Sequence, residues 1–580
     1  MTPRLPRAST MFLAVALSVA TGAQAAGHVF SKRFGGASDQ SITSVAVDGA
    51  GNVVVTGSFV GTIDFGGGAL TSAGSQDIFL AKVNSNGTHL WSKRFGDSTA
   101  QAASGVAVDG SGNIYLTGFM NGTVDFGGGA LASAGGQDVF VVRFDAGGNH
   151  AWSKRFGDAS NQLGTGIAVD GTGSVVQIGT FSGSMDFGGG TLTSAGSTDV
   201  FLARYDSGGN HAWSKRFGDA SAQTGTAIAV DPNGNVVGTG SFNGTVNFGG
   251  TPLTSAGSTD IFLAKYDSGG THAWSKRLGD ASAQTGTAVA FDGSGNVVVA
   301  GSFNGSTNFG GGALTSVGGA DAFLARYDPD GTHTWSRAFG STGTDSGNGV
   351  AVDGTRDVVL TGGFQGTVNF GGGPLTSAGG TDFFLARYTP SGVHTSSARA
   401  GDATEQEGLA ASSDASGNSL LAGRFQGSAD FGGGTLTSAG GYDAFLVKLG
   451  TGQQFHTVAP CRAVDTRNAV GPWGGPALAP GPSNRVFSIA GVCGVPTTAV
   501  AVSVNITVTQ TGAAGTLRLY PGDTGAAWIP TATSISFAAS KTRANNASVL
   551  LSRDGTGSLG VRNDAPDTVH FILGVTGYFE

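Results

Sequence analysis

The stretch Asp64-Phe65-Gly66-Gly67-Gly68 could do chemistry, because an aspartate beside a glycine run can hold a metal or face a phosphate. An Asp-Phe-Gly triplet holds magnesium in protein kinases, but only together with a separate catalytic loop, which this sequence lacks. The element or a close variant occurs seven times, and three copies carry asparagine instead: Asn247, Asn308 and Asn369. A ligand that depends on charge would tolerate this replacement poorly. The pattern favours a loop that the phenylalanine anchors and the glycines turn.

Histidine also recurs once per copy, at His28, His89, His150, His211, His272, His333 and His394. A metal needs ligands about 2 Å away, whereas equivalent positions on neighbouring sheets are about 10 Å or more apart, so no metal site is expected. Five tryptophans lie two residues after a histidine, on the same strand face: Trp91, Trp152, Trp213, Trp274 and Trp335. They either pack between neighbouring units or form a ring of aromatic patches that stack on sugars with avidity.

Aspartates open seven turns that resemble Asp-Gly-Ser-Gly-Asn: Asp48, Asp109, Asp170, Asp231, Asp292, Asp353 and Asp414. Oxygen ligands at alternating positions could bind calcium, but the bidentate glutamate of an EF-hand loop is missing. Aspartate also stabilises turns through its own backbone. We therefore expect turn formation and predict no cofactor, with calcium as the open alternative.

Catalytic signatures are missing from the chain. It has no Gly-x-Ser-x-Gly, His-Glu-x-x-His, paired Cys-x-x-Cys or phosphate-binding loop motif. A glycoside hydrolase uses one asymmetric pair of carboxylates in one cleft, whereas the acidic residues here repeat in every unit. We predict no enzyme and no catalytic residues. A polysaccharide-active hydrolase is the weaker alternative, since unlike side chains could still meet at a central point.

All of these residues follow one period. The phenylalanine of the glycine-rich element stands at Phe65, Phe126, Phe187, Phe248, Phe309, Phe370 and Phe431, each 61 residues after the one before. The second unit contains four runs that are typical of strands, at 105–109, 113–119, 138–144 and 150–156. Four antiparallel strands repeated radially form the blade of a β-propeller.

The phase of the repeat predicts a closed ring. Residues 28–34 match a fourth strand that has no first three before it, and the seventh unit stops after its third strand near Leu449. The N-terminal strand can therefore complete the last blade and hide the sheet edges. An open solenoid, the alternative, would need distinct capping repeats. The predicted fold is all-β: a seven-bladed β-propeller over residues 28–450, closed by the N-terminal strand.

Two segments carry a resemblance to a known family: AVDGAGNVVVTGSF at 46–59, followed by DFGG, and DIFLAKYDSGGTHAWSKR at 260–277. They resemble the SBBP family, the seven-bladed β-propeller repeats of secreted bacterial proteins. The resemblance covers about residues 28–450 and implies a propeller in an extracytoplasmic setting. It implies no catalytic residues, because members share no single reaction.

Strand alternation places the glycine-rich loops on the same face as the loops that join consecutive units. This face is the candidate binding surface, because loops on a rigid scaffold often carry function; a merely solvated rim is the alternative. Its repeated polar residues are Asp97, Gln101, Asp158, Gln162, Asp219, Gln223, Asp280, Gln284, Asp402 and Gln406. They predict a secreted or cell-surface binding protein for a glycan or a protein. A structural envelope protein without a small ligand is the alternative.

The N-terminal residues predict export. Arg4 and Arg7 precede an apolar run from Met11 to Ala20, and a small-x-small cleavage site ends at Ala25, which is typical of a signal peptide over residues 1–25. No later segment has about 18 continuous apolar residues, so no membrane span is expected in the mature chain. The net charge of −8 with no basic block argues against nucleic acid. We expect a monomer.

The repeat ends near residue 455, where proline becomes more frequent. Residues 498–510 alternate apolar and polar side chains, and further strand-like runs follow, so residues 455–580 predict a second all-β, sandwich-like domain. The motifs APCRAVDTR and GVCGVP resemble a module at the ends of secreted bacterial proteins. Cys461 and Cys493 are the only cysteines, and an oxidising compartment predicts a disulfide between them. Asp465 and Arg467 are expected to form a structural ion pair.

Overall fold

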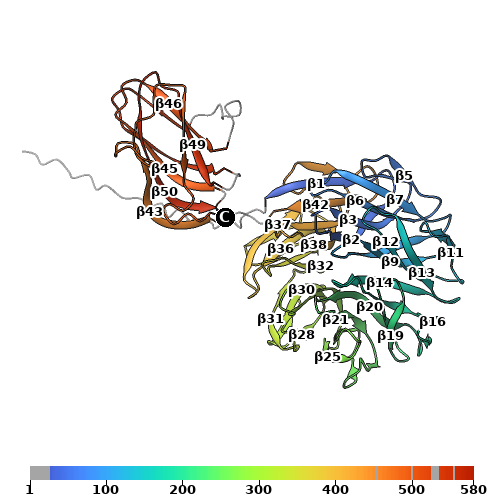
Figure 1. Cartoon of the computed structure of the whole chain (residues 1–580). Helices are drawn as coiled ribbons and strands as arrows, with labels where there is room; N and C mark the ends of the chain where they lie inside the picture. The colour runs from blue at the N-terminus through green and yellow to red at the C-terminus, as the bar shows by residue number, and fades with distance from the viewer. Residues whose placement is uncertain are drawn as a thin grey trace, which may run out of the picture. The chain divides into compact units, whose positions relative to one another are not determined.

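The computed structural model describes residues 27–450, 455–497, 499, 501–523, 534–552 and 556–579. All regular elements in these residues are β-strands, and no helix there is long and apolar enough to cross a membrane. The chain divides into two compact units at residues 451 and 452 (Figure 1). The predicted signal peptide, residues 1–25, lies outside the described residues.

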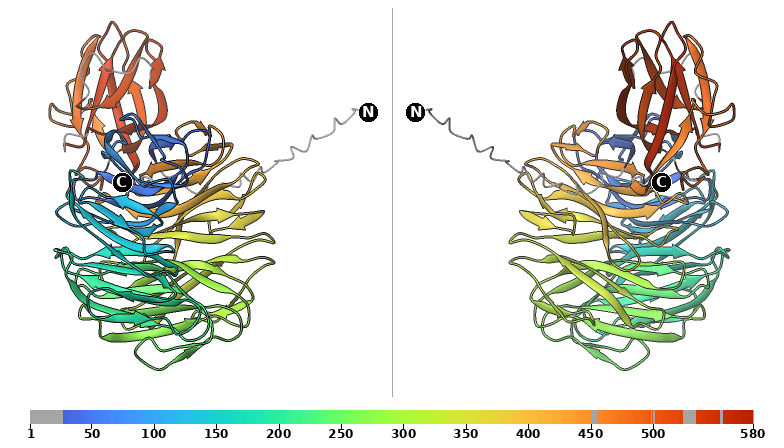
Figure 2. Two further views of the ribbon diagram at one scale, coloured as in Figure 1. Left: turned by 90° about the vertical axis from the view of Figure 1, so that its right-hand side faces the viewer. Right: turned by 90° about the vertical axis from the view of Figure 1, so that its left-hand side faces the viewer.

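Within residues 27–450 the first unit contains seven four-stranded antiparallel sheets, which follow one another in chain order in the side views of Figure 2. From the innermost to the outermost strand they are β2 (Gln40–Val47), β3 (Val53–Phe59), β6 (Asp77–Val83) and β7 (His89–Phe95); β8 (Gln101–Val108), β9 (Ile114–Met120), β12 (Asp138–Phe144) and β13 (His150–Phe156); β14 (Gln162–Val169), β15 (Val175–Phe181), β18 (Asp199–Tyr205) and β19 (His211–Phe217); β20 (Gln223–Val230), β21 (Val236–Phe242), β24 (Asp260–Tyr266) and β25 (His272–Leu278); β26 (Gln284–Phe291), β27 (Val297–Phe303), β30 (Asp321–Tyr327) and β31 (His333–Phe339); β32 (Ser346–Val352), β33 (Val358–Phe364), β36 (Asp382–Tyr388) and β37 (His394–Ala400); and β38 (Gln406–Ser413), β39 (Ser419–Phe425), β42 (Asp443–Leu449) and β1 (His28–Phe34).

The two middle strands of each sheet are buried because both of their faces meet a neighbouring sheet. In β6, for example, every residue is buried, as its run of apolar side chains predicts. A tight turn joins the first two strands: in the second sheet Oδ1 of Asp109 accepts hydrogen bonds from the backbone N–H groups of Ser111 and Asn113, both at 2.9 Å. The repeated aspartates therefore form turns, which is the structural role that we expected.

The N-terminal strand β1 completes the seventh sheet. It pairs antiparallel with β42, with Phe34 opposite Ala444, although the two strands are more than 400 residues apart. Figure 1 shows the two strands side by side. Phe30 and Phe34 belong to one hydrophobic cluster that contains Leu446 of the seventh sheet and Ile42 of the first. The first and last sheets are therefore packed against each other.

Each glycine-rich element forms the tip of a short hairpin between the second and third strands. The hairpins are β4–β5 (Thr62–Asp64, Ala69–Thr71), β10–β11 (Thr123–Asp125, Ala130–Ala132), β16–β17 (Ser184–Asp186, Thr191–Thr193), β22–β23 (Thr245–Val246, Leu253–Thr254), β28–β29 (Ser306–Asn308, Ala313–Thr315), β34–β35 (Thr367–Asn369, Pro374–Thr376) and β40–β41 (Ser428–Asp430, Thr435–Thr437). Phe65 at the first tip is 4% exposed, and its ring centroid lies 5.0 Å from that of Phe79.

The aspartate of the tip acts as a hydrogen-bond acceptor for the loop. Oδ1 of Asp64 accepts from the backbone N–H groups of Gly66 (2.7 Å) and Gly68 (3.2 Å), whose φ angles are 106° and 109°. Oδ1 of Asn308 accepts the equivalent bonds from Gly310 and Gly312. Because an amide oxygen replaces a carboxylate oxygen here, asparagine and aspartate are interchangeable, and the element is a loop fastener.

This role predicts a difference between two substitutions of Asp64. Asp64→Asn keeps the accepting oxygen, so the free energy of unfolding should change little. Asp64→Ala removes both bonds and should lower it by about 1 kcal/mol. Chemical denaturation of the full chain measures both values, and equal effects of Asn and Ala would contradict the assignment.

The second unit consists of two four-stranded sheets around one core. One contains β43 (Phe455–Asp465), β50 (His570–Phe579), β45 (Ala501–Thr509) and β48 (Arg543–Leu550), and the other contains β44 (Ser483–Ser488), β49 (Ser558–Asn563), β46 (Gly515–Pro521) and β47 (Ile535–Phe537). Residues of both sheets, such as Val504 and Val561, form one cluster. The predicted disulfide between Cys461 and Cys493 is present, and Nη2 of Arg467 lies 2.8 Å from Oδ2 of Asp465.

Candidate functional site

The innermost strands of all seven sheets line one cavity of 250 Å³ in the first unit. Threonine hydroxyls link neighbouring inner strands around it: Oγ1 of Thr43 donates to the carbonyl of Ala103 at 2.7 Å, and Thr165 and Thr226 donate likewise to Gly225 and Gly286. The other lining residues are serine, asparagine, glycine and aliphatic residues, so none of the described residues that line this cavity is ionisable. The described side chains that line this cavity therefore include no general acid or base.

The glutamines of the predicted binding face are buried, which corrects the expectation that they lie on its surface. Gln101, Gln162, Gln223, Gln284 and Gln406 are all 0 or 1% exposed. In the second sheet Nε2 of Gln101 donates to Oδ1 of Asp97 (2.7 Å) and to the carbonyl of Asn121 (2.9 Å), and Oε1 accepts from the N–H of Asp97 (3.2 Å). Sequence periodicity could not reveal this, because a buried amide that fastens a loop recurs as regularly as an exposed one.

The aspartates of that face are half-buried and hold the same loops together: Asp97, Asp158, Asp219, Asp280 and Asp402. Burial by itself would raise the pKa of Asp97, but hydrogen bonds from Thr99, Thr123 and Gln101 outweigh it and lower that pKa to about 2. These carboxylates are therefore ionised at neutral pH, with part of each side chain facing solvent. Their role in binding stays a prediction.

Four of the seven turn aspartates form an ion pair with a side chain of the same sheet. Nζ of Lys82 lies 2.9 Å from Oδ2 of Asp48, and Nζ of Lys448 lies 2.8 Å from Oδ2 of Asp414. Arg204 pairs with Asp170 and Arg326 with Asp292. Among the described residues no group of three or more acidic, histidine or cysteine side chains is placed to hold a metal. A protein cation thus occupies the place that calcium would need in these four turns.

The tryptophans pack between neighbouring sheets. The Trp213 ring lies against Gly270, where a β-carbon would be 3.0 Å from the ring, and its Nε1 donates to the carbonyl of Ser268 at 3.2 Å. Trp152, Trp274 and Trp335 donate to the equivalent turns, and Trp91 lies against Gly148. The histidine of the same strand covers a hairpin tip: a β-carbon on Gly67 would lie 2.1 Å from Cε1 of His89. Stacking of the exposed ring edges on sugars stays a prediction.

Two outermost strands lack tryptophan, β37 and β1, and the place where the two ends of the repeat region pair explains both. Trp335 covers Gly392 in the turn between the last two strands of the sixth sheet. A tryptophan in place of Ser396 would cover the equivalent turn of the seventh sheet. The last two strands of that sheet, β42 and β1, come from opposite ends of the repeat region, so no such turn joins them. Conversely, Phe30 of β1 occupies the tryptophan position and lies 3.0 Å from a β-carbon built on Gly87.

A set of buried ion pairs was not found by the sequence reasoning. The aspartate that begins the third strand is 0% exposed in six sheets and pairs with an arginine of the outermost strand. The pairs are Asp77–Arg94, Asp138–Arg155, Asp199–Arg216, Asp260–Arg277, Asp382–Arg399 and Asp443–Arg33. The signal was available, because both residues keep the 61-residue period and, β1 excepted, stand 17 residues apart.

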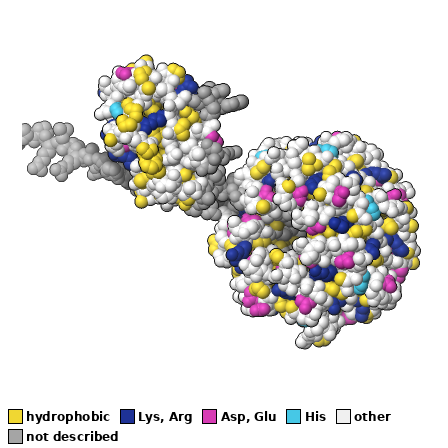
Figure 3. Space-filling model, viewed as in Figure 1, with side chains coloured by type: hydrophobic (Ala, Val, Ile, Leu, Met, Phe, Trp, Pro, Cys, Tyr) yellow, Lys and Arg dark blue, Asp and Glu magenta, His cyan; other side chains and the backbone are white. Residues whose placement is uncertain are grey.

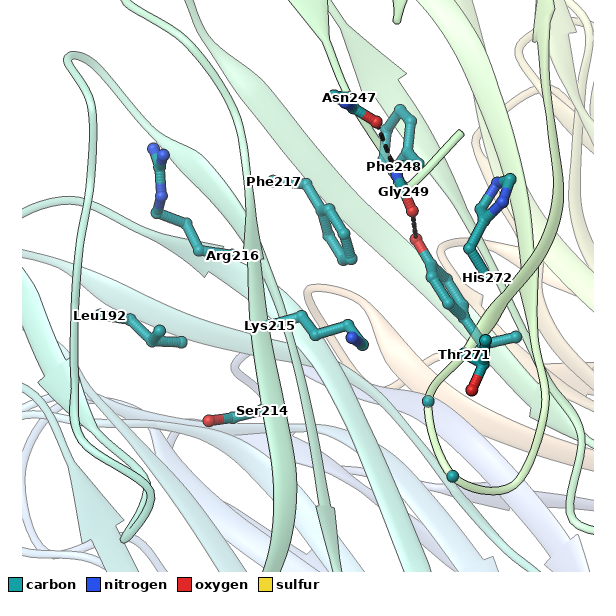
Figure 4. A pocket seen from close by; sticks show the side chains of 13 residues that line it. Leu192, Ser214, Lys215, Arg216, Phe217, Asn247, Phe248, Gly249, Thr271 and His272 are labelled. Atoms are coloured by element: carbon teal, nitrogen blue, oxygen red, sulfur yellow. Dashed lines mark hydrogen bonds between the residues drawn. The ribbon is translucent and has the colours of Figure 1, made fainter. Parts of the chain in front are cut away.

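A cavity of 790 Å³ in the first unit is a groove between the third and fourth sheets (Figure 4). One wall is the outermost strand β19, with Ser214, Lys215 and Arg216; the other is formed by the tip after β22, with Asn247, and by the turn before His272. The structure describes no carboxylate bonded to Lys215, while Arg216 is paired with Asp199. Burial lowers the pKa of His272, so its ring is neutral at pH 7.

The tip that borders this groove departs from the other six. Thr251 replaces the third glycine, whose φ is positive at the other tips, for example 109° at Gly68. Oδ1 of Asn247 accepts from the N–H of Gly249 at 2.7 Å (Figure 4), without the second bond that Asp64 has. A β-branched residue does not favour a positive φ, so the loop takes another course, and its strands β22 and β23 are only two residues long.

The groove offers mixed contacts. The hydroxyl group of Thr271, the amide of Asn247 and the ammonium group of Lys215 can bond a polar ligand, and Leu192 adds an apolar edge. On the face shown in Figure 3, basic and acidic side chains are interspersed, so no patch of one charge sign dominates it. The geometry suits a ligand that is hydrogen-bonded at several points.

Comparisons with known proteins give distant relatives. The chain is 25% identical over 414 residues to an uncharacterized WD repeat-containing protein, L264, of Acanthamoeba polyphaga mimivirus, covering 56% of this chain and 30% of the relative. It is 29% identical over 172 residues to the regulatory protein FlaEY of Caulobacter vibrioides, covering 28% of this chain and 18% of the relative. The chain thus spans less than a third of either relative's length.

Among solved structures, a mutant of puromycin hydrolase covers 78% of this chain and 57% of its own, with a TM-score of 0.36 and 11% identity. The exo-beta-1,3-galactanase of Phanerochaete chrysosporium covers 71% of this chain and 96% of its own, with a TM-score of 0.24 and 9% identity. Such scores carry no functional argument. The family model described as a beta-propeller repeat, SBBP, matches residues 90–119 and 212–241, and the chain therefore contains SBBP beta-propeller repeats.

Proposed function

We propose that this chain is an exported binding protein whose seven sheets form a closed seven-bladed propeller with β1 as the closing strand. The shared cluster of the first and last sheets supports closure. Export is supported by the signal-like N-terminus and agrees with the disulfide of the second unit. The rigid core makes the propeller a scaffold, and binding depends on the loops and grooves at its surface.

The groove between the third and fourth sheets is the observation that carries this proposal. It combines hydrogen-bonding groups from two sheets with a lysine of β19 for which no carboxylate partner is described, and it lies beside the tip that breaks the repeat. A glycan is the favoured ligand, because sugars present hydroxyl groups that suit several short polar contacts. The cavity lined by the innermost strands of all seven sheets has no ionisable residue among its described lining residues, and this supports binding over hydrolysis.

The test is binding of the full chain to a glycan array and to cell-wall fractions, compared with Lys215→Ala. If the groove binds the glycan, the variant should bind about 10- to 100-fold more weakly, because loss of one charged hydrogen bond is worth about 1.5–3 kcal/mol. Lys154→Ala, the equivalent change one sheet earlier, is the matched control and should bind normally.

Binding of a protein instead of a glycan would appear as capture of an envelope protein with the same sensitivity to Lys215→Ala. No binding to any glycan, cell-wall fraction or envelope protein would contradict the proposal and leave the structural envelope role. Release of sugars during the assay would favour the hydrolase alternative.

A further inference from the structure

The fifth sheet breaks the buried ion-pair pattern. Asp321 begins its third strand and is 2% exposed, like its six counterparts. The arginine that neutralises those counterparts is replaced by Ala338 in β31. Oδ2 of Asp321 accepts the backbone N–H of Val317 at 3.1 Å, and Oδ1 has no hydrogen-bond partner. This carboxyl group therefore has no cation beside it.

A second carboxyl group is present at the same junction, that is, at the loop that leads from the outermost strand of one sheet to the innermost strand of the next. Asp345, just before the first strand of the sixth sheet, replaces the glutamine of the other junctions and is 1% exposed. Its two oxygens accept the backbone N–H groups of Ser341 and Gln365, both at 2.8 Å. Ser341 itself replaces the aspartate that stands at this loop position in Asp97 and its equivalents. The junction has thus lost an arginine and gained a buried acid.

The surrounding elements supply no compensating charge. From β31, Arg337 turns away and its Nε donates to the carbonyl of Gly392; from the sixth sheet, Gln365 is neutral. The backbone N–H of Asp345 donates to the carbonyl of Ala320, which precedes Asp321, at 2.7 Å. The two acids therefore lie at the same junction, and the charge of Asp345 acts on Asp321. Burial raises the pKa of Asp321 to about 6, with a further increase from the charge of Asp345, and burial also raises the pKa of Asp345. Two buried like charges of this kind favour uptake of one proton.

We propose that Asp321 and Asp345 share one proton and form a pH-responsive latch between the fifth and sixth sheets. In the protonated state the pair carries a single negative charge, and the loop 340–345 stays bound through the N–H groups of Ser341 and Gln365. Loss of the proton to solvent leaves two buried carboxylates that repel each other, which loosens this loop while the six arginine-paired junctions are unaffected.

The sign of the pH dependence follows from the raised pKa. Since Asp321 binds its proton more tightly in the folded chain than in the unfolded chain, its contribution to stability is present at low pH and is lost as the pH rises through about 6. The latch is therefore closed in acid and open at neutral to alkaline pH.

The test measures the melting temperature and the amide exchange of residues 338–346 in the full chain between pH 4.5 and 8.5. Asp345→Gln restores the residue of the other junctions and removes one charge. Relative to wild type, it should slow exchange of this loop about tenfold at pH 8 and leave it unchanged at pH 4.5. Ala338→Arg should have the same effect by supplying the missing cation.

Asp330→Asn is the control for net charge, because it removes an exposed acid from the turn at the opposite end of β30 and β31 and should shift neither quantity at any pH. A difference between Asp345→Gln and wild type that is equal at pH 4.5 and pH 8 would overturn the proposal, since it would show a steric effect without a proton. If Asp345→Gln folds poorly, Ala338→Arg decides by itself: absence of protection at pH 8 in this variant would also overturn the latch.

Discussion

A chain that begins at residue 37 is expected to lose the cooperative unfolding transition of the first unit, whereas a chain that begins at residue 27 keeps it. The deletion removes β1, and with it Phe30 and Phe34, which are 7% and 4% exposed. Loss of one buried phenylalanine costs about 3–5 kcal/mol. It also removes Arg33, which lies 2.5 Å from the buried Asp443. The sum approaches the whole stability of a typical domain, about 5–15 kcal/mol.

Calorimetry and size-exclusion chromatography measure this outcome. The unpaired edge of β42 should also make the shortened chain aggregate, because an exposed strand edge pairs with other chains. Val29→Thr is the control within the same strand, since Val29 is 45% exposed and its replacement should change stability by less than about 0.5 kcal/mol. Equal melting of the two chains would show that β1 does not close the seventh sheet.

Arg155→Ala is expected to destabilise the first unit by about 3 kcal/mol, because removal of one partner leaves a buried charge uncompensated. Its partner Asp138 is 0% exposed and also accepts the backbone N–H of Ala134 at 2.7 Å. Denaturant unfolding of the full chain measures the loss. The double variant Arg155→Ala/Asp138→Asn should recover part of it, since the uncompensated charge is gone.

Lys154→Ala provides the control for net charge, because Lys154 precedes Arg155 in β13 and removal of its ammonium group leaves the buried pair intact. It should change stability by less than about 0.5 kcal/mol. An equal loss in the two variants would mean that the arginine stabilises through general charge instead of its pair with Asp138.

The repeat made the strands and their grouping predictable. Each unit alternates strand-like runs with turns of Asp, Gly and Asn, and local turn chemistry acts the same way in every copy. The offset of half a unit at the two ends predicted the pairing of β1 with β42, which the structure contains. Exchange of Asp for Asn at three tips correctly indicated a loop fastener, because both residues offer one oxygen to the same N–H groups.

The candidate binding face was less predictable for a physical reason. Gln101 and its equivalents recur in polar loops, yet their amides are buried in hydrogen bonds with Asp97 and Asn121. Periodicity reports that a position matters in every sheet but does not distinguish a solvent contact from an internal one. The groove beside Lys215 also depends on the spacing between two sheets, which no local pattern encodes.

The sequence by itself determined the all-β class, the strands and their turns, because these depend on alternation and turn residues within about a dozen positions. It also determined the disulfide partners, since only two cysteines exist. Only the tertiary structure decided which polar residues are buried, which arginine neutralises which aspartate, and that Asp321 and Asp345 are buried at one junction without a cation. Burial and charge pairing arise between sheets, where the distance in space is unrelated to the distance along the chain.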